Sequence, residues 1–147
     1  MSEIKIRDML KIDAERLAEI NKKCFSVPWS LESMKKESKN KLASYKIAEI
    51  DGEIVGYGGF WLIMDEAEIT NVVVSEEYRG KKISKLLMNE LIEKARERGA
   101  SYMSLEVRSK NEIAKNLYKG LDFKVDGLRK NYYNNPKDDC YIMTLKL

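Results

Sequence analysis

A short basic loop at residues 79–85 holds the groups best suited to chemistry in this sequence. It follows an apolar run at residues 72–74 and leads into an amphipathic helix. At a helix start the first backbone N–H groups lack intrahelical partners and the helix dipole is positive, so anions bind there. The loop therefore predicts a cradle for a diphosphate, with a solvated helix start as the alternative. Its members are Arg79, Gly80, Lys81, Lys82, Ile83, Ser84 and Lys85.

A second candidate is the polar face of the segment at residues 102–108. Met103, Leu105 and Val107 alternate with Ser104, Glu106 and Arg108, which is the period of a strand. A strand between two helices normally has both faces covered, so a polar face there indicates a cleft. The alternative is that Glu106 pairs with Arg108 at a strand end.

The sequence contains no histidine, which excludes the commonest general base and the commonest metal ligand. Catalysis would depend on carboxylates, tyrosines, lysines or ordered water. A covalent acyl-enzyme at Cys24 or Cys140 is therefore disfavoured, and no metal site is expected.

Length and composition indicate one domain at residues 1–147. With 44% hydrophobic and 35% charged residues the chain has the composition of an ordinary globular protein. The net charge of +3 is small and its cations are not interleaved with aromatics, so direct nucleic-acid binding is not favoured. Apolar stretches are too short to span a membrane, and the two cysteines have no pairing pattern, so we expect a cytoplasmic protein.

Apolar spacing predicts alternating strands and helices in one α/β unit. Ser30 is a predicted helix cap, Asp51-Gly52 a hairpin turn, and Gly99 and Gly120 are predicted helix ends. The predicted strands are residues 4–7, 45–50, 53–63, 66–74, 102–108, 124–131 and 140–145, and the predicted helices are residues 13–24, 30–39, 84–98 and 111–119.

The order Arg79-Gly-Lys-Lys-Ile-Ser84 resembles the Arg/Gln-x-x-Gly-x-Gly/Ala signature of the GNAT acetyltransferases, whose loop holds the pyrophosphate of acetyl-CoA. Lys82 and Ser84 stand where the family usually has glycine. The element order also resembles that family. The resemblance implies the GNAT fold, a single mixed central sheet flanked by helices on both faces, with acetyl-CoA as cosubstrate.

A finer resemblance is to N-terminal protein acetyltransferases of the RimI type, which acetylate the N-terminal alanine of small-subunit ribosomal protein number eighteen. It extends from Ile4 to Leu145. The matching segments are Leu105-Glu-Val-Arg108, Asn111, Ala114-x-x-Leu117-Tyr118-x-x-Leu121-x-Phe123, Pro28-Trp29-Ser30 and Arg129-x-Asn131-Tyr132-Tyr133.

This resemblance implies roles for particular residues. Glu106 would be the general base, and Tyr118 the general acid that protonates the departing thiolate. Tyr118 could instead be a core aromatic packed on Phe123, and Asn111 could bind the pantetheine arm or cap its own helix. Backbone groups of Val72, Val73 and Val74 would bind the cofactor and the oxyanion. The acceptor groove would use Trp29, Tyr132 and Tyr133, which could otherwise be surface aromatics.

The implied function is acetyl transfer from acetyl-CoA to a protein N-terminus, with a ribosomal protein as the acceptor. One alternative is an acetyltransferase for another amine, such as a lysine, a polyamine or an antibiotic. A second alternative is a non-catalytic acyl-CoA-binding regulatory module, which the residues Lys82 and Ser84 motivate.

Overall fold

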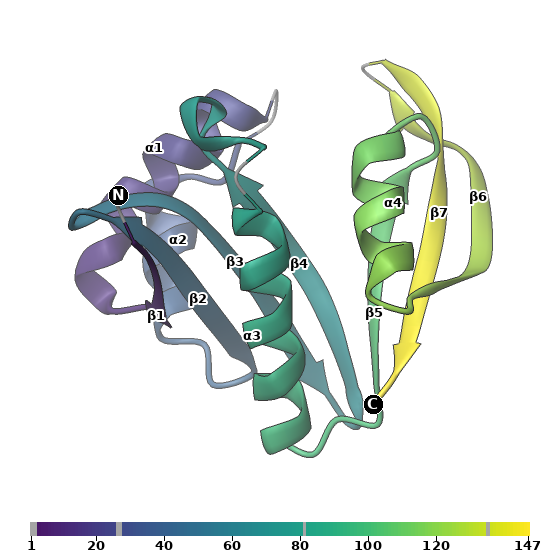
Figure 1. The fold of residues 1–147 in the computed structure, drawn as a ribbon, viewed down its shortest axis with the longest axis horizontal. Coiled ribbons are helices and arrows are strands. Elements are labelled where there is room, and N and C mark those ends of the chain that lie inside the picture. Colours follow the sequence, from purple (N-terminus) through teal and green to yellow (C-terminus); the bar gives the residue numbers. More distant parts are fainter. Residues whose placement is uncertain (1–2, 26–27, 81, 135) are drawn as a thin grey trace.

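The computed structural model describes residues 3–25, 28–80, 82–134 and 136–147, and Figure 1 shows its fold. Every predicted strand and helix is present, in the predicted order. The strands are β1 (Ile4–Asp8), β2 (Ala43–Ile50), β3 (Glu53–Ile63), β4 (Glu66–Val74), β5 (Tyr102–Arg108), β6 (Lys124–Asn134) and β7 (Lys137–Lys146), and the helices are α1 (Ala14–Cys24), α2 (Leu31–Ser38), α3 (Ile83–Glu97) and α4 (Glu112–Gly120), with 3-10 turns at Lys11–Asp13 and Glu76–Tyr78.

The strands form a seven-stranded mixed sheet in the order β1-β2-β3-β4-β5-β7-β6. Of the pairings between described strands, β4 with β5 is parallel and the others are antiparallel. The expected single mixed sheet is therefore confirmed.

The two central strands pair over a short length only. The ladder between β4 and β5 runs from Glu66 opposite Tyr102 to Glu68 opposite Ser104. Beyond that point the two strands diverge, as Figure 1 shows. The upper half of β4 therefore has β3 on one side and an opening on the other.

Helices cover both faces of the sheet, as expected. In Figure 1, α3 and α4 lie in front, while α1 and α2 lie behind β2 and β3. The main core cluster joins Met88 and Leu91 of α3 to Phe60, Met103 and Met143 of the sheet. On the opposite face a second cluster packs α1 and α2 against β2 and β3. Each fully buried Leu or Met contributes roughly 1.5–3 kcal/mol, so these clusters hold the helices in place.

The local signals of turns and caps act mostly as the sequence predicts. The Ser30 hydroxyl accepts the Ser33 N–H at 3.1 Å, and Asp51 and Gly52 form the β2–β3 turn with φ of 53° and 80°. Gly99 follows α3 with φ of 87°. Gly120 is the last residue of α4, as predicted, and the left-handed residue after the helix is Asp122, with φ of 72°.

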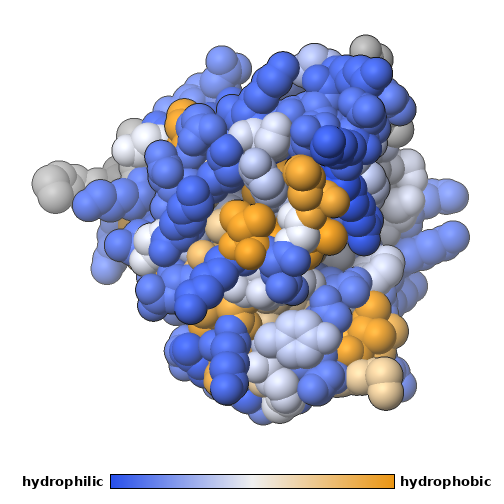
Figure 2. Space-filling view, turned by 90° about the vertical axis from the view of Figure 1, so that its right-hand side faces the viewer, coloured by the Kyte–Doolittle hydropathy of each residue, from blue (hydrophilic) through white to orange (hydrophobic). Residues whose placement is uncertain are grey.

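The β6 strand forms one edge of the sheet and pairs irregularly with β7. Its register shifts between Val125 and Gly127 and again between Arg129 and Tyr133. Figure 2 views the side that carries α4, β6 and β7, where hydrophobic side chains lie in separate patches between hydrophilic ones. In the described part of the chain, no helix is long and apolar enough to cross a membrane.

Candidate active site

A pocket of about 700 Å³ lies between the upper part of β4 and α4, where β4 no longer pairs with β5. Its walls come from the end of α1, the upper part of β4, the start of α3 and one face of α4. Lys81, which the sequence also predicts for this site, lies outside the described residues. The pocket contains ten of the predicted cofactor-binding residues together with the predicted general acid: Val72, Val73, Val74, Arg79, Gly80, Lys82, Ile83, Ser84, Lys85, Asn111 and Tyr118.

The first turn of α3 forms the part of the pocket suited to an anion. The helix begins at Ile83, whose side chain is buried, while Ser84 and Lys85 line the pocket. The first N–H groups of a helix have no intrahelical acceptors, and the positive end of its dipole lies at the same place. A diphosphate placed there would meet these N–H groups and the ammonium group of Lys85.

Lys82 is the N-cap of α3 and adopts a left-handed backbone conformation, with φ of 64° and ψ of 16°. Gly80 has a φ of 81° in the same loop. Left-handed backbone favours glycine because a Cβ atom there crowds the following carbonyl. The position at which the GNAT pattern usually has glycine thus keeps the glycine-like conformation with a lysine in place.

The Arg79 side chain makes two contacts that hold this loop in place. Its Nε donates a hydrogen bond to the Val74 carbonyl at 3.1 Å, and its Nη2 lies 3.5 Å from Cys24 Sγ. These contacts tie the end of β4 to the end of α1. Part of the guanidinium is therefore engaged within the protein, although Arg79 also lines the pocket.

The β4 strand presents backbone groups to the opening. A register shift between Gly59 and Phe60 leaves Thr70 as an extra residue in β4, which is a bulge. Beyond it, β3 pairs with one edge of Val72, Val73 and Val74 only, so alternate N–H and C=O groups face the opening. Next to them, Asn71 Oδ1 is a buried side-chain oxygen without a hydrogen-bond partner among the described residues.

One face of α4 closes the pocket. Asn111 caps this helix, since its Oδ1 accepts the Ala114 N–H at 3.1 Å, and it also lines the pocket. Tyr118 lines the pocket two turns later and packs on Phe123, with ring centroids 5.9 Å apart. Both interpretations of Tyr118 are therefore compatible with its position. Burial raises its pKa, so the phenol remains protonated at neutral pH and is able to donate a proton.

Glu106 lies on the other face of β5, away from α4, with its side chain 44% exposed. It forms an ion pair with Arg129 of β6 at 3.2 Å, whereas Arg108 donates to the Pro136 carbonyl at 2.7 Å. The partner that the structure gives Glu106 is thus a residue distant in sequence. The Glu68 carboxyl lies near those of Glu66 and Glu106. Burial and these two nearby charges raise the pKa of Glu68.

The aromatic residues predicted for the acceptor groove lie outside the 700 Å³ pocket. Trp29 is half-buried against the cluster under α1 and α2, and its N–H donates to Asn21 Oδ1 at 2.7 Å. Tyr132 and Tyr133 pack edge to face on β6, 5.1 Å apart. The Tyr133 hydroxyl lies 3.7 Å from Cys140 Sγ, and that sulfur lies 3.8 Å from Glu106, so the tyrosine pair is close to the carboxylate.

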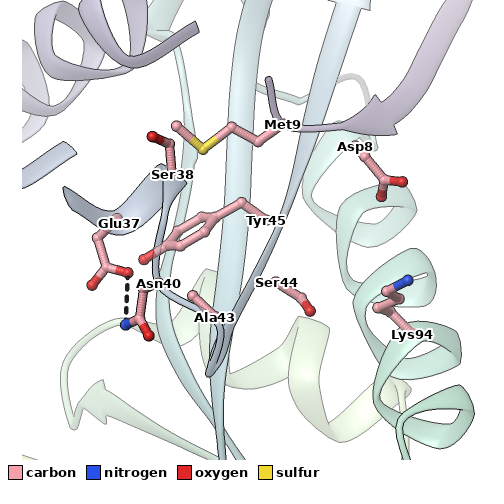
Figure 3. Close-up of a pocket in the computed structure, with 9 residues that line it drawn as sticks. All are labelled: Asp8, Met9, Glu37, Ser38, Asn40, Ala43, Ser44, Tyr45 and Lys94. Atoms are coloured by element: carbon pink, nitrogen blue, oxygen red, sulfur yellow. Dashed lines mark hydrogen bonds between the residues drawn. The ribbon is translucent and has the colours of Figure 1, made fainter. Parts of the chain in front are cut away.

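A second pocket of about 180 Å³ lies under α2, and Figure 3 shows the residues that line it. Glu37 accepts hydrogen bonds from Trp61 Nε1 at 3.0 and 3.1 Å and from Asn40 Nδ2 at 3.5 Å. The Tyr45 hydroxyl bonds Thr70 Oγ1 at 3.0 Å. Glu37 thus joins α2 to Trp61 of β3, and the Tyr45 hydroxyl is engaged between β2 and β4. Among the described residues, no group of three or more Cys, Asp or Glu side chains is placed to hold a metal ion.

Comparisons with known proteins agree with this geometry. Residues 14–123 match the acetyltransferase (GNAT) family. The chain belongs to the GNAT acetyltransferase family. It is 35% identical over 138 residues, 92% of this chain and 93% of the other, to the ribosomal protein bS18-alanine N-acetyltransferase of Haemophilus influenzae. A Bacillus subtilis protein provisionally named for the same activity is 38% identical over 139 residues, 94% of this chain and 92% of its own.

The fold agrees with a solved GNAT enzyme. The crystal structure of the ribosomal-protein-S18-alanine N-acetyltransferase from Escherichia coli superposes with a TM-score of 0.89 at 25% identity, covering 98% of this chain and 94% of the other. The predicted family and fold are therefore confirmed. As a GNAT member the protein is an acetyl-CoA-dependent N-acetyltransferase, and its large pocket fits such a cosubstrate.

Six pocket residues are absent from the predicted site residues: Cys24, Phe25, Tyr78, Ile113, Ala114 and Leu117. Helical spacing from Asn111 could have found the α4 wall, because Ala114, Leu117 and Tyr118 follow it at three, six and seven residues. No local signal marks Cys24 and Phe25. The C-terminal end of α1 reaches the pocket only because α1 packs across the sheet.

Proposed function

We propose that this protein acetylates the α-amino group of the N-terminal alanine of ribosomal protein bS18. The proposal rests on one arrangement. The pocket on the α3 and α4 side brings together a helix start, open strand backbone and Tyr118, while Glu106 lies on the opposite face of β5. The coenzyme and the acceptor would thus approach the opening between β4 and β5 from different faces. Names of relatives support the choice of acceptor, which would place the enzyme in the cytoplasm.

In this proposal the first turn of α3 binds the diphosphate, with Lys82 and Lys85 adding charge. Open backbone groups of Val72, Val73 and Val74 and the Asn111 side chain bind the pantetheine arm. These residues line one continuous pocket, which supports the assignment. The thioester would then lie between β4 and Tyr118.

Transfer requires the acceptor amine to lose a proton, because an α-ammonium group has a pKa near 8. Glu106 would take that proton, directly or through water. The amine nitrogen then forms a bond to the acetyl carbon, and a backbone N–H in residues 72–74 stabilises the oxyanion. As the carbon–sulfur bond breaks, Tyr118 donates its proton to the thiolate. The nitrogen then loses its second proton, which returns to the Tyr118 phenolate through water. The products are the acetylated N-terminus and CoA, and the proton on Glu106 passes to solvent.

Trp29, Tyr132 and Tyr133 would border the acceptor groove. The short distance from the tyrosine pair through Cys140 to Glu106 supports this role for Tyr132 and Tyr133. Trp29 has weaker support, since it packs on the core beneath α1 and α2.

Mass spectrometry of a peptide panel incubated with the protein and acetyl-CoA tests the proposed acceptor. The panel contains the alanine-starting bS18 peptide, the same peptide with a blocked N-terminus and an internal lysine, and two polyamines. Acetylation confined to the free alanine terminus is expected. Transfer to lysine or polyamines instead would reject the bS18 acceptor, and acetyl-CoA binding without any transfer would favour the regulatory-module alternative.

Glu106→Gln tests the base. It preserves shape but removes the proton acceptor, so turnover near neutral pH should fall by roughly a hundredfold or more. Acetyl-CoA affinity should be unchanged, because Glu106 lies outside the pocket wall. Glu90→Gln, an exposed carboxylate on α3, is the matched control. Full turnover in Glu106→Gln would remove Glu106 from the mechanism.

A further inference from the structure

Arg129 and Glu106 form an ion pair that connects the edge of the sheet to its centre. Arg129 Nη1 lies 3.2 Å from Glu106 Oε2, and the two side chains are 53% and 44% exposed. An ion pair this exposed contributes little to folding stability, because solvent screens it. Its main effect is on the orientation of Glu106.

The strand register explains how the two side chains meet. Arg129 of β6 is opposite Cys140 of β7, and Cys140 is in turn opposite Arg108 of β5. Glu106 lies two residues before Arg108, on the same face. Arg129 thus has to extend across β7 to reach Glu106, over roughly two strand spacings of about 4.8 Å each. The small side chain of Cys140 in between leaves room for this extension.

Two groups contact the same oxygen of Glu106. Besides Arg129, Cys140 Sγ lies 3.8 Å from Oε2, and its single thiol proton is shared between that oxygen and the Tyr141 carbonyl at 3.5 Å. The Tyr133 hydroxyl donates to Cys140 Sγ at 3.7 Å. Burial raises the pKa of Cys140, which keeps this thiol protonated as a donor. No hydrogen bond joins Oε1 to another residue that the structure describes. One oxygen of Glu106 is therefore held by the protein and the other is available to a substrate.

Arg129 is itself held by the irregular part of β6. Its guanidinium carbon lies 5.3 Å from the centre of the Tyr132 ring, within range of a cation–π contact. Tyr132 packs edge to face on Tyr133, which contacts Cys140. These contacts connect Glu106, Arg129, Tyr132, Tyr133 and Cys140. Because of the register shift between Arg129 and Tyr133, their partners on β7, Cys140 and Asp138, are only two residues apart, so both side chains lie near Cys140.

We infer that Arg129 is a positioning residue: it fixes Glu106 through Oε2, so that Oε1 takes the proton of the acceptor amine. This inference rests on the proposed role of Glu106 as the base. Arg129 does not itself accept or donate a proton in the reaction. Without it, the Glu106 side chain would sample other rotamers, and misplacement of a catalytic group by about 1 Å can cost roughly a hundredfold in rate.

Steady-state kinetics of Arg129→Met with the alanine-starting peptide and acetyl-CoA tests this inference. We expect kcat to fall roughly ten- to a hundredfold, with the peptide KM and the acetyl-CoA affinity changed by less than about threefold. Arg129→Lys should restore part of the loss, because an ammonium group retains the charge but not the planar fork. Lys130→Met, the loss of a neighbouring exposed cation, is the matched control and should resemble wild type.

Glu106→Gln combined with Arg129→Met separates positioning from direct action. If Arg129 acts through Glu106, adding Arg129→Met to Glu106→Gln should lower kcat no further. A full additional loss in the double variant would overturn the inference, because Arg129 would then act on the substrate. A rise in peptide KM at unchanged kcat in Arg129→Met would also overturn it, since Arg129 would then only form the groove wall.

Two controls show whether Arg129→Met remains folded and whether Glu106 is the general base. Thermal unfolding of Arg129→Met should match wild type within about 3 °C, because the ion pair is exposed. Full activity of Glu106→Gln would reject the proposed base and this inference together. Loss of activity in Glu106→Gln with normal kinetics in Arg129→Met would reject this inference alone.

Discussion

Replacing Lys82 by glycine should stabilise the protein, because Lys82 adopts a left-handed backbone conformation at the start of α3. Its φ of 64° is unfavourable for a residue with a Cβ atom, and its side chain makes no capping hydrogen bond. Lys82→Ala is the matched control. Both variants remove the same ammonium group, but only the glycine variant removes the Cβ atom.

The expected gain follows from two opposing contributions. A left-handed non-glycine residue costs about 1–2 kcal/mol, which glycine would recover. Glycine also gains freedom in the unfolded chain, which offsets about 0.5–1 kcal/mol of that recovery. The net gain is then about 0.5–1 kcal/mol. For a chain of 147 residues, that gain raises Tm by about 2–3 °C.

The assay is thermal unfolding monitored by circular dichroism, with and without acetyl-CoA. Lys82→Gly should unfold above wild type, and Lys82→Ala should remain within about 0.5 kcal/mol of it. Both variants should bind acetyl-CoA more weakly to the same degree, since each loses one cation beside the helix start, and added salt should reduce the difference. Equal Tm values for the two variants would refute the strain argument. Much tighter binding and faster turnover in Lys82→Gly alone would instead indicate that the native loop is impaired.

Three further predictions concern the acid, a buried ion pair and a close backbone contact. Tyr118→Phe should slow transfer about a hundredfold or more, the usual contribution of one general acid, while its ring packing keeps Tm near wild type. Asp13→Asn should cost about 2 kcal/mol in urea unfolding at pH 7, because Asp13 is buried and accepts two hydrogen bonds from Arg7 at 2.8 and 2.9 Å. Arg7 holds the pKa of Asp13 below its usual range, so this difference should shrink as the pH falls below about 4. Gly59→Ala should cost at least about 2 kcal/mol, since the new Cβ would lie 2.2 Å from the buried Tyr45 ring.

Controls and contrary outcomes for these three are specific to each site. If the Tyr118→Phe variant is unfolded at the temperature of the assay, the hydroxyl is needed for the stability of the core. Glu93→Gln, which breaks an exposed pair with Arg96, should cost under about 1 kcal/mol, and an equal loss there would contradict the argument from burial. Gly127→Ala should be tolerated because the nearest atom to its Cβ would be 3.5 Å away, in Ile142.

Much of the fold was predictable because its signals are local. The alternation of Met103, Leu105 and Val107 marks β5, and Asp51-Gly52 marks a hairpin by turn chemistry alone. Gly120 shows the limit of such signals. α4 ends at Gly120 as the sequence predicts, but the left-handed conformation that glycine favours is adopted two residues later, by Asp122.

The sequence also determined the chemical groups available to the site. The absence of histidine directs attention to Glu106 and Tyr118, and the basic loop before α3 marks the anion-binding end of the pocket. These features depend on residue type and on spacing within one helix or strand. Neighbours in sequence can therefore reveal them.

Only the tertiary structure decided which distant groups meet. Sequence spacing suggested Arg108 as the partner of Glu106, but the pairing of β6 with β7 brings Arg129 to that carboxylate instead. The opening that holds the pocket exists because β4 and β5 stop pairing after Glu68 and Ser104, just before the bulge at Thr70 of β4. Strand pairing, register shifts and the splay of a sheet depend on contacts between residues far apart in the chain. No local pattern records these contacts.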